Sequence, residues 1–195
     1  MTASAGKKRV AAIAQLRSTS NRLQNLIDVA ICARLAKTQG ASMLFLPECF
    51  GFMGESSQQT LQEAEDAVMD DKNVNEDKVT ESLIFTVSGK QAAHGTDTKG
   101  EGDRIHLLDG LRTIARESGL WISGGGMHVS GAPPDEETGN TRVYNTHVIL
   151  DDKGTVQAIY RKIHLFDVSI PGKVQLRESA TTAPGTKLVV CVTNR

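Results

Sequence analysis

A glutamate and a lysine stand at positions where side chains often perform chemistry. Glu48 follows the apolar run ASMLFLP (41–47), and Lys162 lies in the segment YRKIHLFD (160–167). Sites in α/β proteins gather at the carboxyl ends of strands, where a partly buried carboxylate would have a raised pKa. Such a carboxylate suits general-base catalysis near neutral pH, and a lysine directed into a pocket stabilises an oxyanion. The alternatives are a loop carboxylate and a solvated edge-strand lysine.

The composition is that of an ordinary globular domain. The chain has 195 residues, of which 39% are apolar and 23% charged, and its net charge is −1. That charge, with no Lys/Arg-rich face, indicates neither nucleic acid nor an anionic membrane as a partner. The longest apolar runs are strand-sized, short of the ~18 residues that a membrane helix requires. No apolar region with a cleavage site follows the N-terminus, so we expect no secretory signal.

The cysteines and histidines show no ligand spacing. Cys32, Cys49 and Cys191 are an odd number without a CxxC pair. We therefore expect neither a disulfide framework nor a zinc site, and a reducing, cytoplasmic compartment fits best. The five histidines lack metal-ligand spacing, so we predict no metal and no cofactor. His164 would share a strand face with Lys162, but we interpret it as structural.

The elements that must position these residues begin with a strand, a helix and a strand. Strands are predicted over 9–16 and 41–48, with a helix between them. Ser20 or Asn21 suits the N-cap of this helix, and Gly40 lies past its end. Its predicted apolar face comprises Leu23, Leu26, Ile27, Ala30, Ile31 and Leu35.

The second half of the chain continues the α/β pattern. A helix is predicted over 107–118, ended by Gly119, and a strand over 120–129. Residues 143–165 read as a hairpin of two β-rich runs around the turn DDKG. A last strand is predicted over 186–192.

The stretch from about 68 to 104 departs from this pattern. It is polar, charge-rich and contains glycines, with one apolar island at 82–88. A structureless connection of that length is unusual inside a compact domain. It is either a surface insertion or sequence foreign to the mature protein, such as an unremoved intron. Neither interpretation makes it a chemical site.

Five ordered segments carry a family resemblance. They are FLPECFGFMG (45–54), GLWISGGGMH (119–128), YNTHVI (144–149), YRKIHLFDVSIPG (160–172) and ESATTAPGTK (178–187). Together they resemble the nitrilase superfamily of carbon–nitrogen hydrolases, in particular its branch of deaminated-glutathione amidases and omega-amidases. The resemblance covers residues 9–195 apart from the insertion.

The resemblance implies an αββα sandwich and a Glu–Lys–Cys mechanism that hydrolyses small carboxylic-acid amides. Glu48 matches the general base of the family and Lys162 the lysine that stabilises the tetrahedral intermediate. Glu178 matches a second, supporting glutamate. Family members associate through helices that flank the sheet, which implies a homodimer.

The nucleophilic cysteine does not match. In the family it lies in a segment like CYDxRF, after a further strand and turn beyond the lysine. Cys191 shares the C-x-x-x-R outline with CVTNR (191–195), but it lacks the tyrosine and the aspartate and aligns better with the preceding strand.

We therefore expect a C-terminally truncated sandwich with exposed apolar sheet faces and little or no turnover. The alternatives are a non-catalytic chain that binds ligands or a partner, and a fragment or mis-spliced product of an active enzyme.

Overall fold

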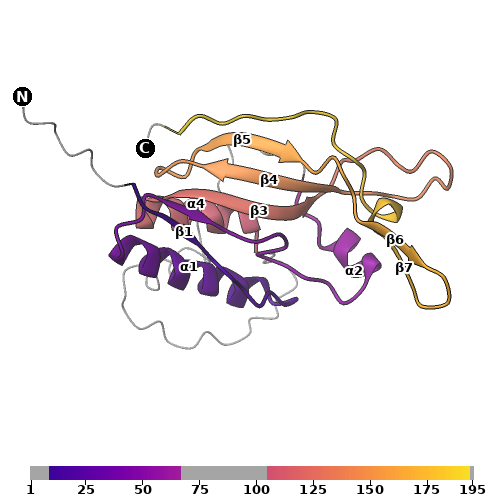
Figure 1. The fold of residues 1–195 in the computed structure, drawn as a ribbon, viewed down its shortest axis with the longest axis horizontal. Coiled ribbons are helices and arrows are strands. Elements are labelled where there is room, and N and C mark those ends of the chain that lie inside the picture. Colours follow the sequence, from indigo (N-terminus) through magenta and orange to yellow (C-terminus); the bar gives the residue numbers. More distant parts are fainter. Residues whose placement is uncertain (1–8, 67–104, 194–195) are drawn as a thin grey trace, which may run out of the picture.

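The computed structural model describes residues 9–66 and 105–193, which build a five-stranded sheet with helices on one face (Figure 1). The strands, in sheet order, are β1 (Ala11–Ile13), β2 (Met43–Phe45), β3 (Trp121–Val129), β4 (Tyr144–Leu150) and β5 (Val156–Arg161). β1, β2 and β3 run parallel, whereas β3, β4 and β5 pair antiparallel. The predicted α/β class is confirmed.

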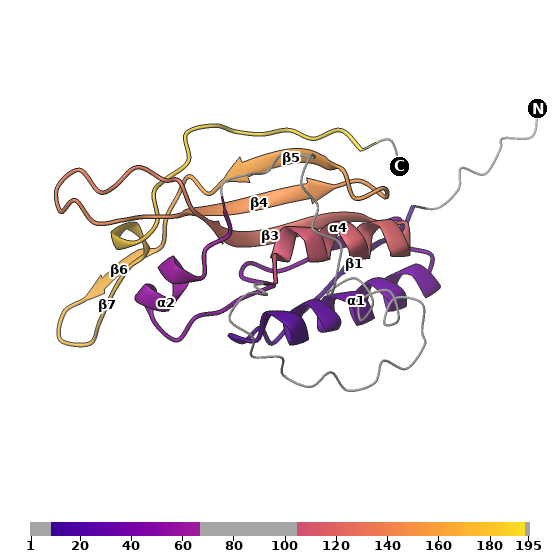
Figure 2. The ribbon, with the colours of Figure 1, turned by 180° about the vertical axis from the view of Figure 1, so that it is seen from behind.

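Two helices, α1 (Arg22–Thr38) and α4 (Leu107–Ser118), cover this face (Figure 2). Asn21 is the N-cap of α1, and its side-chain oxygen accepts a hydrogen bond from the Gln24 backbone N–H at 3.0 Å. Gly119 ends α4 in the left-handed region at φ 62°, which a residue without Cβ adopts at little cost. Both helix boundaries are those that the capping residues predict. No helix among the described residues has the length and apolar character needed to cross a membrane.

The core fills the space between the two helices and the sheet. Its fully buried side chains include Leu26, Leu44, Leu111, Ile114, Ile122 and Leu150. Gly110 lets α4 lie close to α1, because a Cβ on it would lie 2.5 Å from a methyl carbon of Leu26. The predicted apolar face of α1 is partly wrong: Leu35 is exposed, whereas Val29 and Ala33 are buried. Close contact with α4 favours the face that carries the small side chains.

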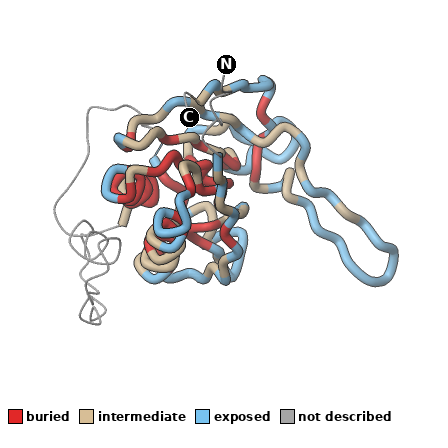
Figure 3. The backbone as a smooth tube through the Cα atoms, turned by 60° about the vertical axis from the view of Figure 1, so that its left-hand side comes forward, coloured by how far each residue is buried: buried red, intermediate tan, exposed pale blue. Residues whose placement is uncertain are grey.

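The sheet face opposite to the helices bears exposed apolar side chains. Neighbouring side chains of a strand point to opposite faces, so Ile13 and Phe45 point away from the core that contains Leu44. They are partners in the β1–β2 register and are 87% and 38% exposed. Buried residues concentrate where the helices meet the sheet (Figure 3). This open face favours association with another apolar surface.

The β4–β5 hairpin forms as predicted, with its turn closed by a hydrogen bond from the Gly154 N–H to the Asp151 carbonyl at 3.0 Å. Beyond β5 the chain forms a second, two-stranded sheet, β6 (Asp167–Ile170) and β7 (Val174–Arg177). This hairpin and the short helix α2 (Ser57–Gln62) were not predicted. α2 contains a single apolar residue, Leu61, and so gives no helical periodicity. β6 (DVSI) and β7 (VQLR) do alternate apolar and polar residues, but four residues each is the lower limit of the alternation that indicates a strand.

The prediction of a strand over 186–192 is wrong. Residues 183–193 contain no strand, and Leu188 and Val190 are almost fully exposed. A strand needs a neighbour that completes its backbone hydrogen bonds, and none of the described strands pairs with this segment. The predicted strands over 9–16 and 41–48 form, but each has only three residues. The predicted insertion at 68–104 lies outside the described residues.

A buried guanidinium joins α1 to two distant segments. Arg22 pairs with the Glu65 carboxylate and donates a hydrogen bond to the Ile105 carbonyl at 2.8 Å. Glu65 also accepts a hydrogen bond from the Leu107 backbone N–H at 3.2 Å. The two charged side chains are only 7% and 6% exposed. Residues near position 65 and residues near position 105, far apart in the sequence, are therefore joined in one network.

Removal of Glu65 should strongly destabilise the fold, because among the described residues it leaves the buried Arg22 guanidinium with only the longer carboxylate contact to the partly exposed Glu63, at 3.4 Å. We expect Glu65→Ala to lower the free energy of unfolding by about 3–5 kcal/mol. The matched control is Glu117→Ala, which removes an exposed partner 4.0 Å from Arg116 and should cost less than about 0.5 kcal/mol. Urea unfolding, followed by the fluorescence of the buried Trp121, measures both. Equal effects of the two variants would contradict this role of the ion pair.

Candidate active site

Glu48 is held on the sheet by backbone hydrogen bonds on both sides of it. The Leu46 N–H donates to the Ser123 carbonyl at 2.9 Å, and the Cys49 N–H donates to the Gly126 carbonyl at 2.8 Å. Between these two points the β3–β4 register shifts, as at a bulge. The loop after β2 thus lies against β3.

Glycines of β3 make this close contact sterically feasible. Gly125 has φ 59°, and a Cβ there would lie 2.0 Å from the Pro47 carbonyl oxygen. A Cβ on Gly126 would lie 2.3 Å from the Asn145 side-chain oxygen and 3.2 Å from Cγ of Glu48. Any larger residue would push the Glu48 loop away from the sheet.

Lys162 and Glu178 come from the chain that follows β5. The Lys162 N–H donates to the Asn145 carbonyl at 2.8 Å, which continues the β4–β5 pairing one residue past β5. Glu178 starts a short 3-10 helix, Glu178–Ala180, after β7. Its carboxylate accepts the Phe166 N–H at 2.6 Å, and its own N–H donates to the Phe166 carbonyl at 3.2 Å. The base of the β6–β7 hairpin therefore fixes this glutamate.

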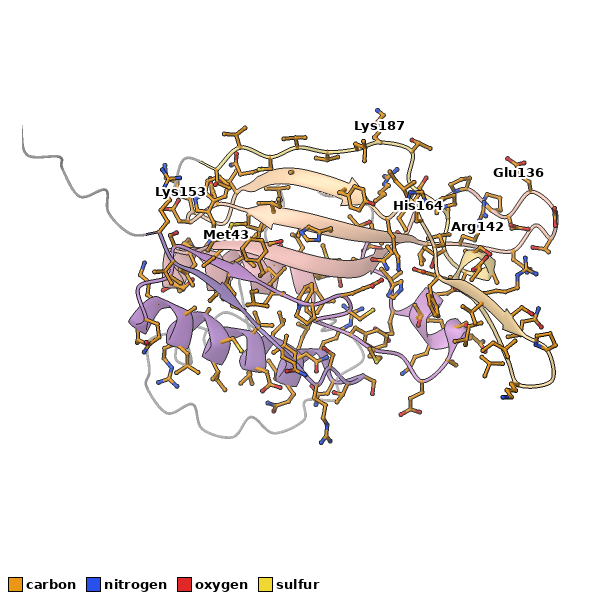
Figure 4. All side chains as sticks on the ribbon, in the orientation of Figure 1. Met43, Glu136, Arg142, Lys153, His164 and Lys187 are labelled. Carbon is orange, nitrogen blue, oxygen red and sulfur yellow. The ribbon has the colours of Figure 1, made fainter. Side chains whose placement is uncertain are left out.

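The three predicted site residues meet in one cluster. Lys162 Nζ lies 2.9 Å from Glu48 Oε1 and 3.0 Å from Glu178 Oε2. The side chains of Glu48, Lys162 and Glu178 are 53%, 26% and 18% exposed, so the cluster is open to solvent on the Glu48 side. His164, by contrast, is exposed where the chain leaves the sheet (Figure 4) and is not among the hydrogen-bond partners of this cluster.

The expectation of a raised pKa for Glu48 is wrong. Burial alone would raise it, but hydrogen bonds from Lys162 and Asn145, together with the positive charge of Lys162, outweigh burial and lower the pKa of Glu48. For Lys162, burial favours the neutral form, but the two carboxylates prevail and raise its pKa. At neutral pH Glu48 is thus a carboxylate and Lys162 is an ammonium.

His128 lies within the electrostatic field of the same cluster. Burial lowers the pKa of this histidine, although the charges of Glu178 and Glu48 act in the opposite direction. It is therefore predominantly neutral at pH 7, and the lysine is the cation of the cluster. The described residues contain no group of three or more His, Cys, Asp or Glu side chains that could hold a metal ion.

The three cysteines are free and differ in their positions. Cys49 adjoins the cluster, with φ 57°, and its pKa is raised to about 11 by burial and by the charge of Glu48. Burial and Asp28 raise the pKa of Cys32 in α1. Cys191 lies in the last described segment, which runs back along β5 away from the β6–β7 hairpin (Figure 1).

Residues 10–195 match the model of the carbon-nitrogen hydrolase family, and the chain belongs to this family, the nitrilase superfamily. It is 36% identical over 174 residues to the Nitrilase and fragile histidine triad fusion protein NitFhit of Drosophila melanogaster, which covers 89% of this chain and 28% of the relative. It is 34% identical over 174 residues to the deaminated glutathione amidase of Mus musculus, covering 89% and 42%. The chain thus spans less than half the length of these relatives.

Solved structures show the same fold. The NitFhit protein of C. elegans superposes with a TM-score of 0.56 at 25% identity, over 92% of this chain and 34% of that one. Saccharomyces cerevisiae Nit3, a member of branch 10 of the nitrilase superfamily, gives 0.55 at 20% identity, over 91% and 48%. The second likeness concerns the fold alone.

Sequence reasoning missed Asn145 and the roles of Gly125 and Gly126. The segments YNTHVI and GLWISGGGMH were noted for the resemblance, without a role for any residue. The run of three glycines inside a predicted strand was the available signal, because glycine in a strand often marks a bulge or a close backbone approach.

The alkylation rate of Cys49 should depend on the charge of the neighbouring cluster. A pKa of about 11, against an ordinary 9.0, reduces its thiolate fraction at pH 8 about a hundredfold, so we expect slow alkylation whose rate still rises between pH 7 and 10. Glu48→Gln should lower this pKa and accelerate the reaction, because it removes a nearby negative charge. Peptide mass spectrometry after iodoacetamide treatment measures the rate at each pH. In Glu55→Gln, a change at an exposed glutamate of the following loop, the rate should stay that of the wild type; equal acceleration there would contradict the assignment.

Proposed function

We propose that this domain carries the base and the oxyanion-binding part of an amidase site for small carboxylic-acid amides. The observation that carries the proposal is the ammonium of Lys162 held 2.9 Å from Glu48 and 3.0 Å from Glu178. A base beside a fixed positive charge is what attack on an amide carbonyl requires.

The proposed reaction uses a cysteine thiol as nucleophile. Glu48, a carboxylate at neutral pH, accepts the thiol proton, and the sulfur attacks the amide carbonyl. Lys162 stabilises the negative oxygen of the tetrahedral intermediate, and the protonated Glu48 returns its proton to the amide nitrogen, which leaves as ammonia. Water then cleaves the thioester, which releases the carboxylic acid and regenerates the thiol. Glu178 holds the lysine in place, because its carboxylate is the second one that contacts Lys162 Nζ.

Relatives support this reaction class and suggest the substrate. An amidase from Nesterenkonia sp. AN1, with a TM-score of 0.55, carries the product of a Michael addition of acrylamide at its active-site cysteine. Other relatives are a deaminated glutathione amidase and, at 28% identity, the human omega-amidase NIT2. We therefore propose deaminated glutathione or small omega-amides as substrates, and a reducing, cytoplasmic compartment that keeps the thiols free.

The nucleophile, we propose, is none of the three cysteines of this chain. Cys49 stays protonated at neutral pH because its pKa is about 11, and its neighbour is the base itself. Cys32 lies in α1, and Cys191 belongs to the last described segment, which runs away from the β6–β7 hairpin (Figure 1). Residues 1–195 alone should consequently give little or no turnover.

A second candidate function is binding without turnover. It is favoured by the same cluster, because the partly exposed ammonium can donate a hydrogen bond to the carbonyl or carboxylate of an amide ligand even without a nucleophile.

We also propose that the chain associates as a homodimer through the helices that flank the sheet.

An ammonia-release assay with deaminated glutathione and small omega-amides tests the proposed lack of turnover. We expect the 195-residue chain to release no more ammonia than its Lys162→Met variant. Calorimetric titration with the same amides should distinguish binding from inertness, since binding should be lost in Lys162→Met. Turnover that Cys191→Ser abolishes, with an acyl group trapped on Cys191, would instead identify that residue as the nucleophile.

A further inference from the structure

We propose that Asn145 is a positioning residue: its side-chain amide links the carboxylates of Glu48 and Glu178, so that both stay on one ammonium. This inference rests on the proposed function, because it concerns the same cluster. It assigns to a neutral, buried side chain of β4 a role that the Glu–Lys–Cys scheme does not contain.

The hydrogen bonds of Asn145 reach every member of the cluster. Its Nδ2 donates to Glu48 Oε1 at 2.5 Å and to Glu178 Oε1 at 3.3 Å. Its backbone carbonyl accepts the Lys162 N–H at 2.8 Å. Glu48 lies in the loop after β2 and Glu178 at the start of a 3-10 helix, so among the described residues the Asn145 side chain and Lys162 Nζ are the contacts that connect them.

Electrostatics explains why a second link is needed. Two carboxylates share one ammonium, which leaves one excess negative charge, and like charges at this separation repel each other. An amide NH₂ group has two N–H donors and no charge, so it offers one hydrogen bond to each carboxylate without adding to the imbalance. A lysine or arginine at this position would compete with Lys162 for the same oxygens.

Burial makes the amide rigid. Asn145 is 4% exposed, whereas the Glu48 side chain is 53% exposed. The buried amide is therefore fixed by its surroundings, and it can restrain the more exposed carboxylate. Gly126 provides the space for it, because a Cβ there would lie 2.3 Å from the Asn145 side-chain oxygen. The same glycine accepts the Cys49 N–H, so the loop and the amide are placed by one residue of β3.

The test measures two groups: Glu48, which the Asn145 side chain contacts, and Lys162 Nζ, which it does not. We would titrate Lys162 Nζ and the Glu48 carboxyl carbon by NMR in the isotope-labelled 195-residue chain. In Asn145→Ala the pKa of Glu48 should rise, because its carboxylate loses a donor. The pKa of Lys162 should fall toward its ordinary value, since the carboxylates separate from it.

Asn25 provides the matched control. It is also a buried asparagine, 2% exposed, and its amide donates to the Thr19 and Gly51 carbonyls. Asn25→Ala should lower the free energy of unfolding but leave the titration of Lys162 and Glu48 as in the wild type. If Asn145→Ala does not fold, Asn145→Leu keeps the branched shape of the side chain with methyl groups in place of the amide atoms, and it should give the same shifts because it has no donors.

The outcomes separate the two proposals. A fall in the Lys162 pKa in the Asn145 variants alone supports the positioning role. An unchanged Lys162 pKa in these variants, or an equal fall in Asn25→Ala, overturns it. An ordinary Lys162 pKa in the wild type would mean that the cluster is not assembled in solution, and then the proposed function fails as well.

Discussion

One ion-pair cluster, an ammonium between two carboxylates, is the feature on which the proposed chemistry depends. Lys162 Nζ lies about equally far from Glu48 and Glu178, at 2.9 Å and 3.0 Å. Burial disfavours the charged forms of both Glu48 and Lys162, and the contacts between the ammonium and the carboxylates outweigh that penalty. The opposite charges thus stabilise each other inside a partly buried site, where neither would be favourable alone.

The scaffold makes this cluster possible through close backbone contact. Gly125 and Gly126 let the loop with Glu48 lie directly on β3, where a side chain would collide with Pro47 or Asn145. The β4–β5 hairpin brings Lys162 beside Asn145, and the base of the β6–β7 hairpin holds Glu178. The buried Arg22–Glu65 pair secures the helical side of the sheet.

Much of the fold followed from local signals. Asn21 and Gly119 marked helix ends because capping and a left-handed residue are properties of a few neighbouring positions. The DDKG turn marked a hairpin for the same reason. The strand expected at 186–192 failed because a strand requires a partner, which is not a local property. The β6–β7 hairpin does alternate apolar and polar residues, but each of its strands has only four residues, the shortest run that indicates a strand.

The sequence alone determined the family and named Glu48, Lys162 and Glu178, because the spacing of five motifs is a linear property. Only the tertiary structure decided how these residues affect one another. The lowered pKa of Glu48, opposite to the expectation from burial, results from donors 97 and 114 positions away in the chain. The contribution of Asn145 likewise became visible only when β4 had placed its amide between two glutamates that are remote in sequence. Charges and hydrogen bonds act through space, so their balance is set by the fold.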